Sequence, residues 1–460
     1  MAAVQSSPSS PTQSRTKKGP LVTEPPKFDI ESYVQNYKGR TRYERLLLIG
    51  TSSSFLGVEA LKAAVVEAKA GKDTRRYVEA CNHLQAVAPQ EPEAVRDQAW
   101  VDTVGKQNLA ETARLEAELK GYKNNLIKES IRMGNEDLGK HYQAIGDLPK
   151  AFEAFSRMRQ DVSIPKHIVD VSMHLIEVAI EQRNWISVVS NVQKIRGIQS
   201  VVEDDKSIQQ YIAAADGLAN MDMGNYHTAA LHFLSTEAGM GSSCNSIISP
   251  NDVAIYGGLC ALASMERSDL HKRVLENSNF RTYLELEPHI RRAITFFVNS
   301  RYSACLSILE AYRADYLLDI HLQDHVDELY YMVRSKSIVQ YFIPFSCVTL
   351  DSLNAAFAAP GKTIDKELGQ MIARKELIAR IDTQNRLLTS VPSAARSTLQ
   401  ATALKTAREY EREARRRIQH MNIVGAELDI RAGKNPGALD ELLDGGILGS
   451  SQRAKAGGYQ

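Results

Sequence analysis

The chain has 460 residues, of which 43% are hydrophobic and 24% charged, so we expect a soluble globular protein of about two to four domains. Its 56 Lys and Arg residues nearly balance its 55 Asp and Glu residues, and the net charge of +1 gives no electrostatic reason to bind nucleic acid or an anionic membrane. The five cysteines are scattered without a Cys-x-x-Cys pair, which predicts reduced thiols rather than disulfides or a structural zinc.

Residues 1–26 are predicted to form a disordered tail. Five of the fifteen prolines fall here, among Ser, Thr and Gln, and this composition buries too little apolar surface to offset the entropy of ordering. The tail lacks the apolar segment of a signal peptide. No stretch of the sequence reaches the roughly 20 successive apolar residues of a membrane-spanning helix.

Residues 27–125 are expected to form an N-terminal helical region, followed by helical repeats over residues 126–335. In the repeats, apolar residues recur every three or four positions, which is the period of amphipathic helices. A short motif returns along this region: a turn residue, a polar residue and then a large apolar residue that enters a helix. Its copies begin at Gly146, Arg183, Gly224 and Ser300, with a weaker copy at Ser268.

The same register predicts a buried helical face. Nine positions after the four clear starts stand the apolar residues Phe155, Val192, Phe233 and Leu309. A spacing of about 34 to 40 residues is typical of tetratricopeptide-like (TPR-like) α-solenoids. We therefore predict a degenerate solenoid, which offers extended surfaces rather than a deep catalytic pocket.

The pattern changes near residue 337, where short helices and two short strands are expected. The helices are predicted at 337–345, 350–358 and 363–374, and the strands at 377–382 and 385–390. Three helices and a β-hairpin within about 55 residues are typical of a winged helix. Residues 336–392 are thus a small α/β winged-helix domain in an otherwise all-α chain.

Residues 393–431 are predicted to form one long helix, and residues 432–460 a flexible tail. The apolar residues of the helix are spaced by three and four positions, a near-heptad stripe that predicts a packing partner. The stripe consists of Ala403, Ala407, Tyr410, Ala414, Ile418, Met421, Val424 and Leu428.

Sequence motifs give little support for an enzyme. Gly361-Lys362-Thr363 matches only the last three positions of a phosphate-binding loop, and a helix precedes it where such a loop follows a strand. His321 and His325 are expected on one helical face, but Leu322 replaces the glutamate of a zincin and no third ligand is suggested. We predict no catalytic residues, no cofactor and no metal site.

A winged helix leaves a nucleic-acid adaptor open as an alternative. Its third helix would be the recognition helix, yet Lys366 and Arg374 are offset there by Asp365 and Glu367. That balance makes a poor phosphate-binding face, so nucleic acid is not the expected partner.

A helical solenoid that runs into a winged helix resembles the PCI family, named for the proteasome lid, the COP-nine signalosome and a translation initiation factor. Within it, the N-terminal segment resembles the signature of the first-subunit family of the signalosome, Tyr-x-Gly-x-x-Arg-x-x-Arg-Leu-x-x-Ile. The matching residues are Tyr37, Gly39, Arg42, Arg45, Leu46 and Ile49. Residues 252–263, 315–331 and 337–345 resemble the central and PCI segments. The homologous lid subunit of the proteasome is the nearest alternative, and the N-terminal signature favours the signalosome.

The resemblance implies a non-catalytic scaffold subunit of a complex that removes the ubiquitin-like modifier Nedd-eight from cullins. The implied partners are other signalosome subunits, including PCI subunits and the zinc isopeptidase subunit, and cullin-RING ligases. Location in the nucleus and cytoplasm is expected.

Two interfaces are predicted for such a scaffold. The hairpin is expected to leave a strand edge that pairs with a neighbouring PCI subunit, with Ile381, Asp382, Leu387 and Leu388 as its residues. The apolar stripe of the long helix is expected to bury itself in a helical bundle shared by several subunits.

Overall fold

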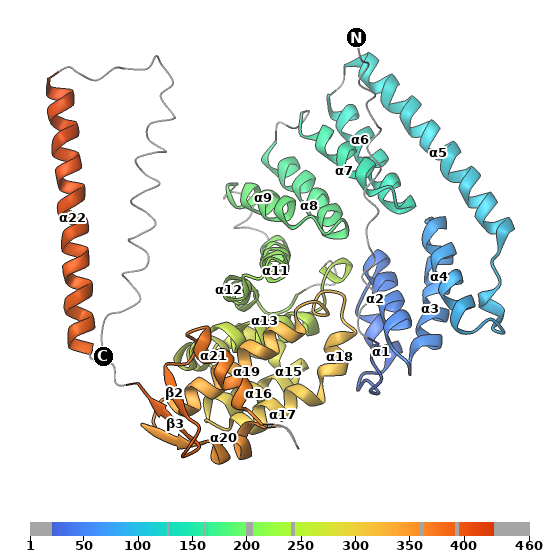
Figure 1. Cartoon of the computed structure of the whole chain (residues 1–460). Coiled ribbons are helices and arrows are strands. Elements are labelled where there is room, and N and C mark those ends of the chain that lie inside the picture. Colours follow the sequence, from blue (N-terminus) through green and yellow to red (C-terminus); the bar gives the residue numbers. More distant parts are fainter. Residues whose placement is uncertain are drawn as a thin grey trace, which may run out of the picture. The chain divides into compact units, whose positions relative to one another are not determined.

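The computed structural model describes residues 21–126, 128–160, 162, 164–198, 206–240, 244–358, 363–391 and 395–426. The chain divides between Ser390 and Val391 into two compact units. The first unit is helical apart from one small sheet, and the described part of the second is a long helix (Figure 1). The predicted fold, all-α with a small α/β winged helix, is confirmed. Apart from the end of the N-terminal tail, the predicted domain limits remain predictions.

The N-terminal helices enclose a hydrophobic core of their own. Asp29, Asp73 and Asp97 cap three of these helices, because each carboxylate accepts a hydrogen bond from a backbone amide of the first turn. The elements are α1 (Ile30–Gln35), α2 (Gly39–Ser52), α3 (Gly57–Ala70), α4 (Thr74–Val87), η1 (Pro92–Ala94) and α5 (Gln98–Asn125).

The predicted N-terminal tail is too long at its C-terminal end. Val22 is buried, its amide donates to the carbonyl of Ser52 at 2.7 Å, and its own carbonyl accepts from the amide of Ser54 at 3.1 Å. Residues 21–26 are therefore part of the ordered N-terminal region, while residues 1–20 lie outside the described residues. Composition alone could not show that the backbone of Val22 forms hydrogen bonds at the end of α2 and in the turn that follows.

The repeats follow as antiparallel helical pairs. They comprise α6 (Lys128–Ile145), α7 (Leu148–Met158), α8 (Pro165–Glu181), α9 (Trp185–Arg196), α11 (Lys206–Asp222), α12 (Tyr226–Leu234), η2 (Cys244–Ser246), α13 (Pro250–Ser264), α14 (Arg267–Asp269), η3 (Leu270–Leu275), α15 (Ser278–Leu286), α16 (Pro288–Val298), α17 (Tyr302–Ala311), α18 (Arg313–Leu317) and α19 (Val326–Phe342).

The four clear repeat starts are all left-handed corners between two helices. Gly146, Arg183, Gly224 and Ser300 have φ angles of 86°, 55°, 78° and 59°. After each corner, the next amide donates to the carbonyl five residues earlier, as Asp147 does to Tyr142 at 2.9 Å. This bond satisfies a free carbonyl at the end of the preceding helix and reverses the chain.

The predicted buried register is confirmed at these four repeats. Phe155, Val192, Phe233 and Leu309 are each no more than 1% exposed. The weaker copy differs, because Ser268 lies inside α14 and the chain continues into the π-helical η3.

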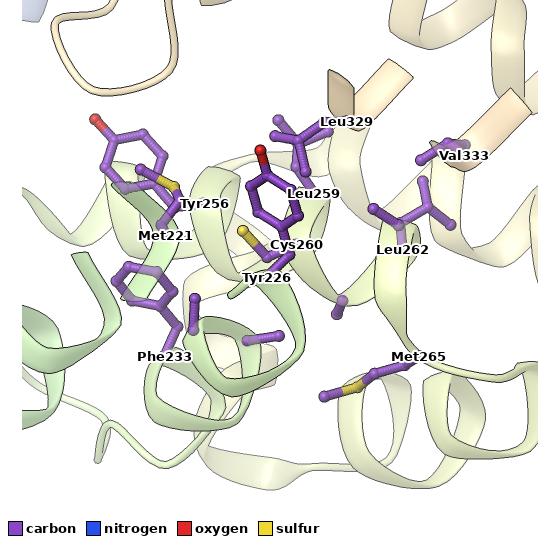
Figure 2. Packing of buried hydrophobic residues seen from close by; sticks show 14 of the residues in the cluster. Met221, Tyr226, Phe233, Tyr256, Leu259, Cys260, Leu262, Met265, Leu329 and Val333 are labelled. Atoms are coloured by element: carbon purple, nitrogen blue, oxygen red, sulfur yellow. The ribbon is translucent and has the colours of Figure 1, made fainter. Parts of the chain in front are cut away.

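Helix α13 lies at the centre of the main hydrophobic core. Figure 2 shows Phe233 of α12, Leu259 of α13 and Leu329 of α19 gathered in one apolar cluster. Close approach depends on small residues: a Cβ added at Gly258 would lie 2.3 Å from Cγ2 of Ile290. Because other elements cover α13 on all sides, its sequence lacks the polar stripe of a helix that faces solvent.

The winged helix contains three strands, not two. Its elements are β1 (Cys347–Thr349), α20 (Leu350–Phe357), α21 (Asp365–Ala373), β2 (Ala379–Asp382) and β3 (Leu387–Ser390). The antiparallel sheet has the order β1-β3-β2, with Leu388 opposite both Val348 and Ile381. The predicted hairpin is confirmed, whereas β1 was missed because three residues are too few to show an alternating pattern. The helix expected at 337–345 is not separate: residues 337–342 are the last part of α19, which ends at Phe342.

The second unit contains α22 (Ala395–Gly425). The long helix predicted at 393–431 is present from Ala395 to Gly425. Leu428 and the predicted tail at 432–460 lie outside the described residues.

The left-handed corners predict opposite effects on stability when two different glycines are changed to alanine. Gly224→Ala is expected to lower the free energy of unfolding by about 1 kcal/mol, because φ is positive although a Cβ there would meet nothing within 4 Å. Gly121→Ala, inside α5 and equally unobstructed, is expected to raise it by about 0.5 to 1 kcal/mol. Chemical denaturation of both variants checks the signs, and a stabilising Gly224→Ala would contradict the corner geometry.

Candidate functional site

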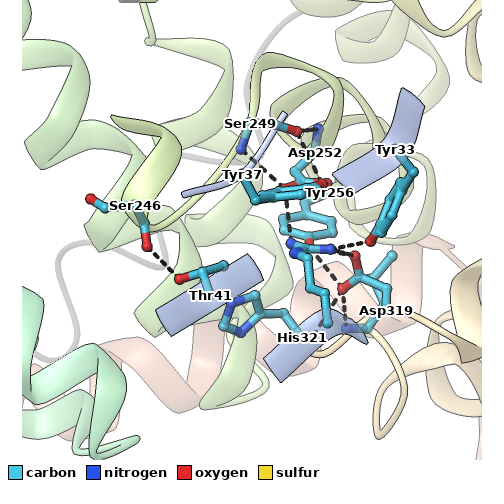
Figure 3. Close-up of polar contacts among 11 residues, drawn as sticks. Tyr33, Tyr37, Thr41, Ser246, Ser249, Asp252, Tyr256, Asp319 and His321 are labelled. Atoms are coloured by element: carbon cyan, nitrogen blue, oxygen red, sulfur yellow. Dashed lines mark hydrogen bonds and ion pairs between the residues drawn. The ribbon is translucent and has the colours of Figure 1, made fainter. Parts of the chain in front are cut away.

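A buried arginine joins three distant parts of the first unit. Arg45 of α2 is 0% exposed, and its guanidinium pairs with two carboxylates. Figure 3 shows the two residues that carry them, Asp252 and Asp319. Nη2 is 2.9 Å from Oδ2 of Asp252 on α13, and Nη1 is 2.5 Å from Oδ2 of Asp319 in the turn before α19. Nη1 also donates to the hydroxyl of Tyr33.

Two tyrosines complete the hydrogen bonds of these carboxylates. The hydroxyl of Tyr37 donates to Oδ1 of Asp252 at 2.7 Å, and that of Tyr256 donates to Asp319 at 2.7 Å. The ring of Tyr37 also stacks on the guanidinium of Arg45, 4.0 Å from its centroid. Burial raises the pKa of both phenols, so they remain protonated donors at neutral pH.

Backbone amides hold the two carboxylates in place. Asp252 forms a capping box with Ser249 at the start of α13. Oδ1 of Asp319 accepts from the amides of His321 and Leu322 at 2.9 and 3.1 Å. Most polar atoms of the cluster are thereby satisfied, as buried charges require.

The protonation of the cluster follows from burial and charge. Burial opposes ionisation of Asp319, but Arg45 and the neighbouring His321 together hold its pKa below the ordinary value. Burial, and then the charge of Asp319, raises the pKa of Asp252. Burial also opposes the charge of Arg45, yet the two carboxylates raise its pKa, so the guanidinium stays charged.

A second polar link lies beside the first. Nε of Arg40 on α2 is 3.3 Å from Oε2 of Glu181 on α8, and Gln143 donates to Oε1 of Glu181 at 2.9 Å. Burial raises the pKa of Glu181 to about 7 despite the nearby guanidinium. The cavity here, lined by Thr41, Glu181 and His321 among others, has a volume of about 10 Å³, which is room for one water.

Sequence reasoning placed Tyr37 and Arg45 in the N-terminal signature but did not predict their partners. Asp252 and Asp319 lie more than 200 residues away from Arg45 along the chain. A usable signal existed, because Arg45 stands on the apolar face of α2, four positions before the fully buried Ile49. A charged residue on such a face needs a buried counter-ion.

The predicted helical histidine pair is wrong. His321 and His325 lie in the turn between α18 and α19, and they point to different neighbours. His321 is buried against Trp185 and Tyr256, whereas Nδ1 of His325 lies 3.0 Å from the hydroxyl of Tyr226. Among the described residues, no group of His, Cys, Asp and Glu is arranged to hold a metal ion. Of the phosphate-loop residues, Gly361 and Lys362 lie outside those ranges.

Of the two basic residues of the proposed recognition helix, Arg374 contacts an aromatic ring of α19. The acidic Glu367 is also paired with α19. Arg334 of α19 pairs with Glu367 of α21 at 2.6 Å, and the guanidinium of Arg374 lies 5.1 Å from the ring centroid of Tyr331. The geometry therefore gives the nucleic-acid alternative no added support.

The predicted strand edge needs a correction. Leu387 and Leu388 lie on β3, the central strand, whose two sides are already paired with β1 and β2. The free edge on this side is β2, which carries Ile381 and Asp382. The carboxylate of Asp382 accepts hydrogen bonds from the side chain of Asn385 at 2.9 Å and from the backbone amides of Asn385 and Gln384. These bonds hold the hairpin turn and lower the pKa of Asp382. Pairing with another subunit remains a prediction.

The apolar stripe of α22 is exposed within its own unit. Exposed fractions are 76% for Tyr410, 57% for Ile418, 70% for Met421 and 47% for Val424. Ala403 and Ala407 are also exposed, and Ala414 is half-buried. Ion pairs such as Arg415–Glu411, at 2.7 Å, occupy the polar face. The helix thus presents a long apolar surface of the kind that marks an interaction site.

Comparison with known proteins agrees with these features. The family model described as 26S proteasome subunit RPN7 matches residues 97–273, and the PCI domain model matches residues 309–390. A COP9 signalosome complex subunit 1 from Emericella nidulans is 51% identical over 429 residues, which cover 90% of this chain and 86% of that protein. The chain belongs to the COP9 signalosome subunit 1 family.

Other relatives bear out the resemblance to this signalosome family. The Arabidopsis thaliana COP9 signalosome complex subunit 1 is 37% identical over 90% of this chain and 94% of its own length. The 26S proteasome regulatory subunit RPN7 of Saccharomyces cerevisiae is 22% identical over 54% of this chain and 58% of its own length, a more distant relation than the proteasome-lid alternative would require. In this member of the COP9 signalosome subunit 1 family, two signature residues, Tyr37 and Arg45, are buried. They belong to the Arg45 cluster, which consists of Tyr33, Tyr37, Arg45, Asp252, Tyr256 and Asp319. None of its described helices has the length and apolar character needed to cross a membrane.

The cluster predicts unequal effects for two arginines of the signature. Arg45→Met leaves two buried carboxylates without their counter-ion and is expected to lower the free energy of unfolding by about 3 to 5 kcal/mol. Arg42→Met, whose side chain is 39% exposed and pairs with Glu67 at 3.4 Å, is expected to lower it by less than about 1 kcal/mol. Denaturant titrations measure both, and equal losses would contradict the assigned role of Arg45.

The buried Glu181 predicts a specific pH dependence. The pKa of an ordinary glutamate is 4.5 and that of Glu181 in the fold is about 7, so the folded state binds the additional proton between these values. Stability from this group is therefore present at low pH and is lost as the pH rises through 7. Between pH 5 and 8, wild type is expected to lose about 2 kcal/mol more stability than Glu181→Gln. The exposed Glu118→Gln should follow wild type, and parallel curves for all three proteins would refute the assignment.

Proposed function

We propose that the chain is a non-catalytic scaffold subunit of a COP9 signalosome, which supports removal of Nedd-eight from cullins and so regulates cullin-RING ligases. Family membership supports a place in a complex with other signalosome subunits. In the family resemblance, isopeptidase chemistry belongs to a different, zinc-bearing subunit. PCI subunits, that isopeptidase subunit and cullin-RING ligases are the proposed partners.

The observation that carries this proposal is the exposed stripe of α22. A solvated helix of this kind gains little from its own sequence, because isolated helices are marginal in water. Burial of each large apolar side chain against other helices contributes about 1.5 to 3 kcal/mol. We propose that Ala403, Ala407, Tyr410, Ala414, Ile418, Met421 and Val424 form the contact with a helical bundle of several subunits, with Leu428 beyond the described helix.

The second proposed interface is the edge of β2. Backbone groups of Ile381 and Asp382 would pair with the equivalent edge of a neighbouring PCI subunit. Leu387 and Leu388 would support that edge from the central strand rather than pair directly. Because Leu388 is fully buried, it keeps β2 attached to the domain.

The N-terminal helices and the solenoid are proposed to contact other subunits or the ligase substrate, because solenoids present extended surfaces. Exchange of residues 28–125 for those of a paralogue is the test of this part. Unchanged ligase binding by the chimaera would argue against it.

We further propose that the protein works in the nucleus and cytoplasm. All five cysteines are free thiols, which fits a reducing compartment. Imaging of the tagged chain at native expression checks this location, and confinement to a secretory organelle would contradict it.

The stripe predicts a loss of assembly on charge insertion. In a pull-down from native extract, full-length chain is expected to recover a multi-subunit assembly with cullin isopeptidase activity. The triple variant Ala407→Asp, Ala414→Asp and Met421→Asp is expected to lose both, because three carboxylates would be buried at the interface without partners.

A matched control separates charge from position. Arg412→Gln, Arg416→Gln and Gln419→Asp change the net charge by the same amount on the polar side of α22 and should leave assembly intact. Loss in both variants would indicate a general effect of charge. A wild-type chain recovered alone would overturn the scaffold proposal.

A further inference from the structure

A groove between α5, α6 and α7 is a third candidate binding surface, remote in sequence from the winged helix and α22. Its volume is about 410 Å³. The floor is formed by the buried side chains of Leu119, Leu138, Tyr142 and Ala154. Apolar side chains of a ligand would find matching surface there.

The two rims of the groove carry an excess of positive charge. The α5 rim has Glu116, Lys120 and Lys123, and the α7 rim has Lys150, Glu153 and Arg157. Four cations thus face two carboxylates across an exposed opening.

Both carboxylates already have partners. Glu116 accepts a hydrogen bond from the hydroxyl of Tyr142 at 2.8 Å, and Glu153 pairs with Arg157 at 2.5 Å. The ammonium groups of Lys120 and Lys123 have no hydrogen bond or ion pair with any residue in the described part of the chain. The free charge of the groove is therefore positive and is concentrated on the α5 rim.

The shape and chemistry favour a peptide over a bare polyanion. Each rim extends for about 10 Å, because an α-helix rises about 1.5 Å per residue, and this length suits two turns of a bound helix. A polyphosphate would leave the apolar floor unfilled and would meet the rim carboxylates. A segment that combines carboxylates with leucines satisfies both the floor and the rims.

We propose that this groove docks a short acidic, leucine-containing segment of a partner protein. The leucines would contact Leu119 and Leu138 on the floor, and the carboxylates would pair with Lys120 and Lys123. The proposal goes beyond the scaffold function, since neither α22 nor β2 contributes to the groove.

Fluorescence anisotropy with the full-length chain tests the proposal. The probe is a labelled peptide of sequence Asp-Glu-Leu-Leu-Asp-Glu-Leu-Leu, at low ionic strength, compared with a version that has Ser for every Leu. Saturable binding that falls at least about tenfold for the Ser version is expected, because apolar contacts would be lost. Absence of binding up to about 1 mM, a limit near −4 kcal/mol, would overturn the proposal.

Charge variants locate the binding. Lys120→Glu with Lys123→Glu should weaken the leucine peptide about tenfold, whereas Lys106→Glu with Lys272→Glu, an equal charge change elsewhere, should leave it within about twofold. Glu116→Gln with Glu153→Gln should tighten binding several-fold. Poor folding of a variant would weaken binding, so this gain could not result from it. Equal loss for both lysine pairs would place binding outside the groove.

A competition experiment distinguishes the alternative ligand class. Inorganic tripolyphosphate should displace the peptide only weakly, through screening that sodium chloride of equal ionic strength reproduces. Displacement well beyond the salt control, together with equal affinity for the Leu and Ser peptides, would show an anion site and overturn the proposal of a peptide site.

Discussion

The ion pair between one guanidinium and two carboxylates fixes how the first unit is assembled. Arg45 is fully buried, and its two bonds to Asp252 and Asp319 connect α2, the start of α13 and the turn before α19. Burying an unpaired charge is costly, so the cluster is stable only when all three segments meet in this geometry. The N-terminal helices consequently have one defined position on the solenoid.

Apolar and backbone contacts reinforce the same junction. Ala314 and Leu318 of the α18 region belong to the hydrophobic core of the N-terminal helices. The amide of Lys38 donates to the carbonyl of Asn245 at 3.1 Å, and that of Lys27 donates to Asp315 at 2.8 Å. On the other side, α13 packs against α19, which leads into the winged helix. A rigid frame from the N-terminal helices to the winged helix is what a scaffold subunit requires.

Local patterns predicted local structure well. The corners at Gly146, Arg183, Gly224 and Ser300 were visible because a turn residue and an apolar residue stand at fixed spacing, and the hairpin was visible from its short β-rich runs. Contacts between distant segments were not visible: the partners of Arg45, the bridge at Val22, and the pairing of β3 on both sides all depend on tertiary packing. A histidine pair at helical spacing was misread for the same reason, since spacing does not reveal that the segment is a turn.

The surfaces left for assembly follow from this frame. The sheet leaves β2 as an edge, and α22 carries an apolar stripe that no described residue of its own unit covers. These surfaces differ from the buried Arg45 cluster, because we propose that their partners are other subunits. The residue pattern predicted both regions, and the topology assigned the edge to β2 rather than to the whole hairpin.

We propose that other subunits cover α22 and the edge of β2 in the assembled complex. Hydrogen exchange of the isolated chain and of the native assembly, followed by mass spectrometry, is the first measurement to make. Amides of 395–425 and 379–382 are expected to become strongly protected on assembly, while those of α13 stay equally protected in both states. Unchanged exchange in α22 and β2 within an intact assembly would contradict it.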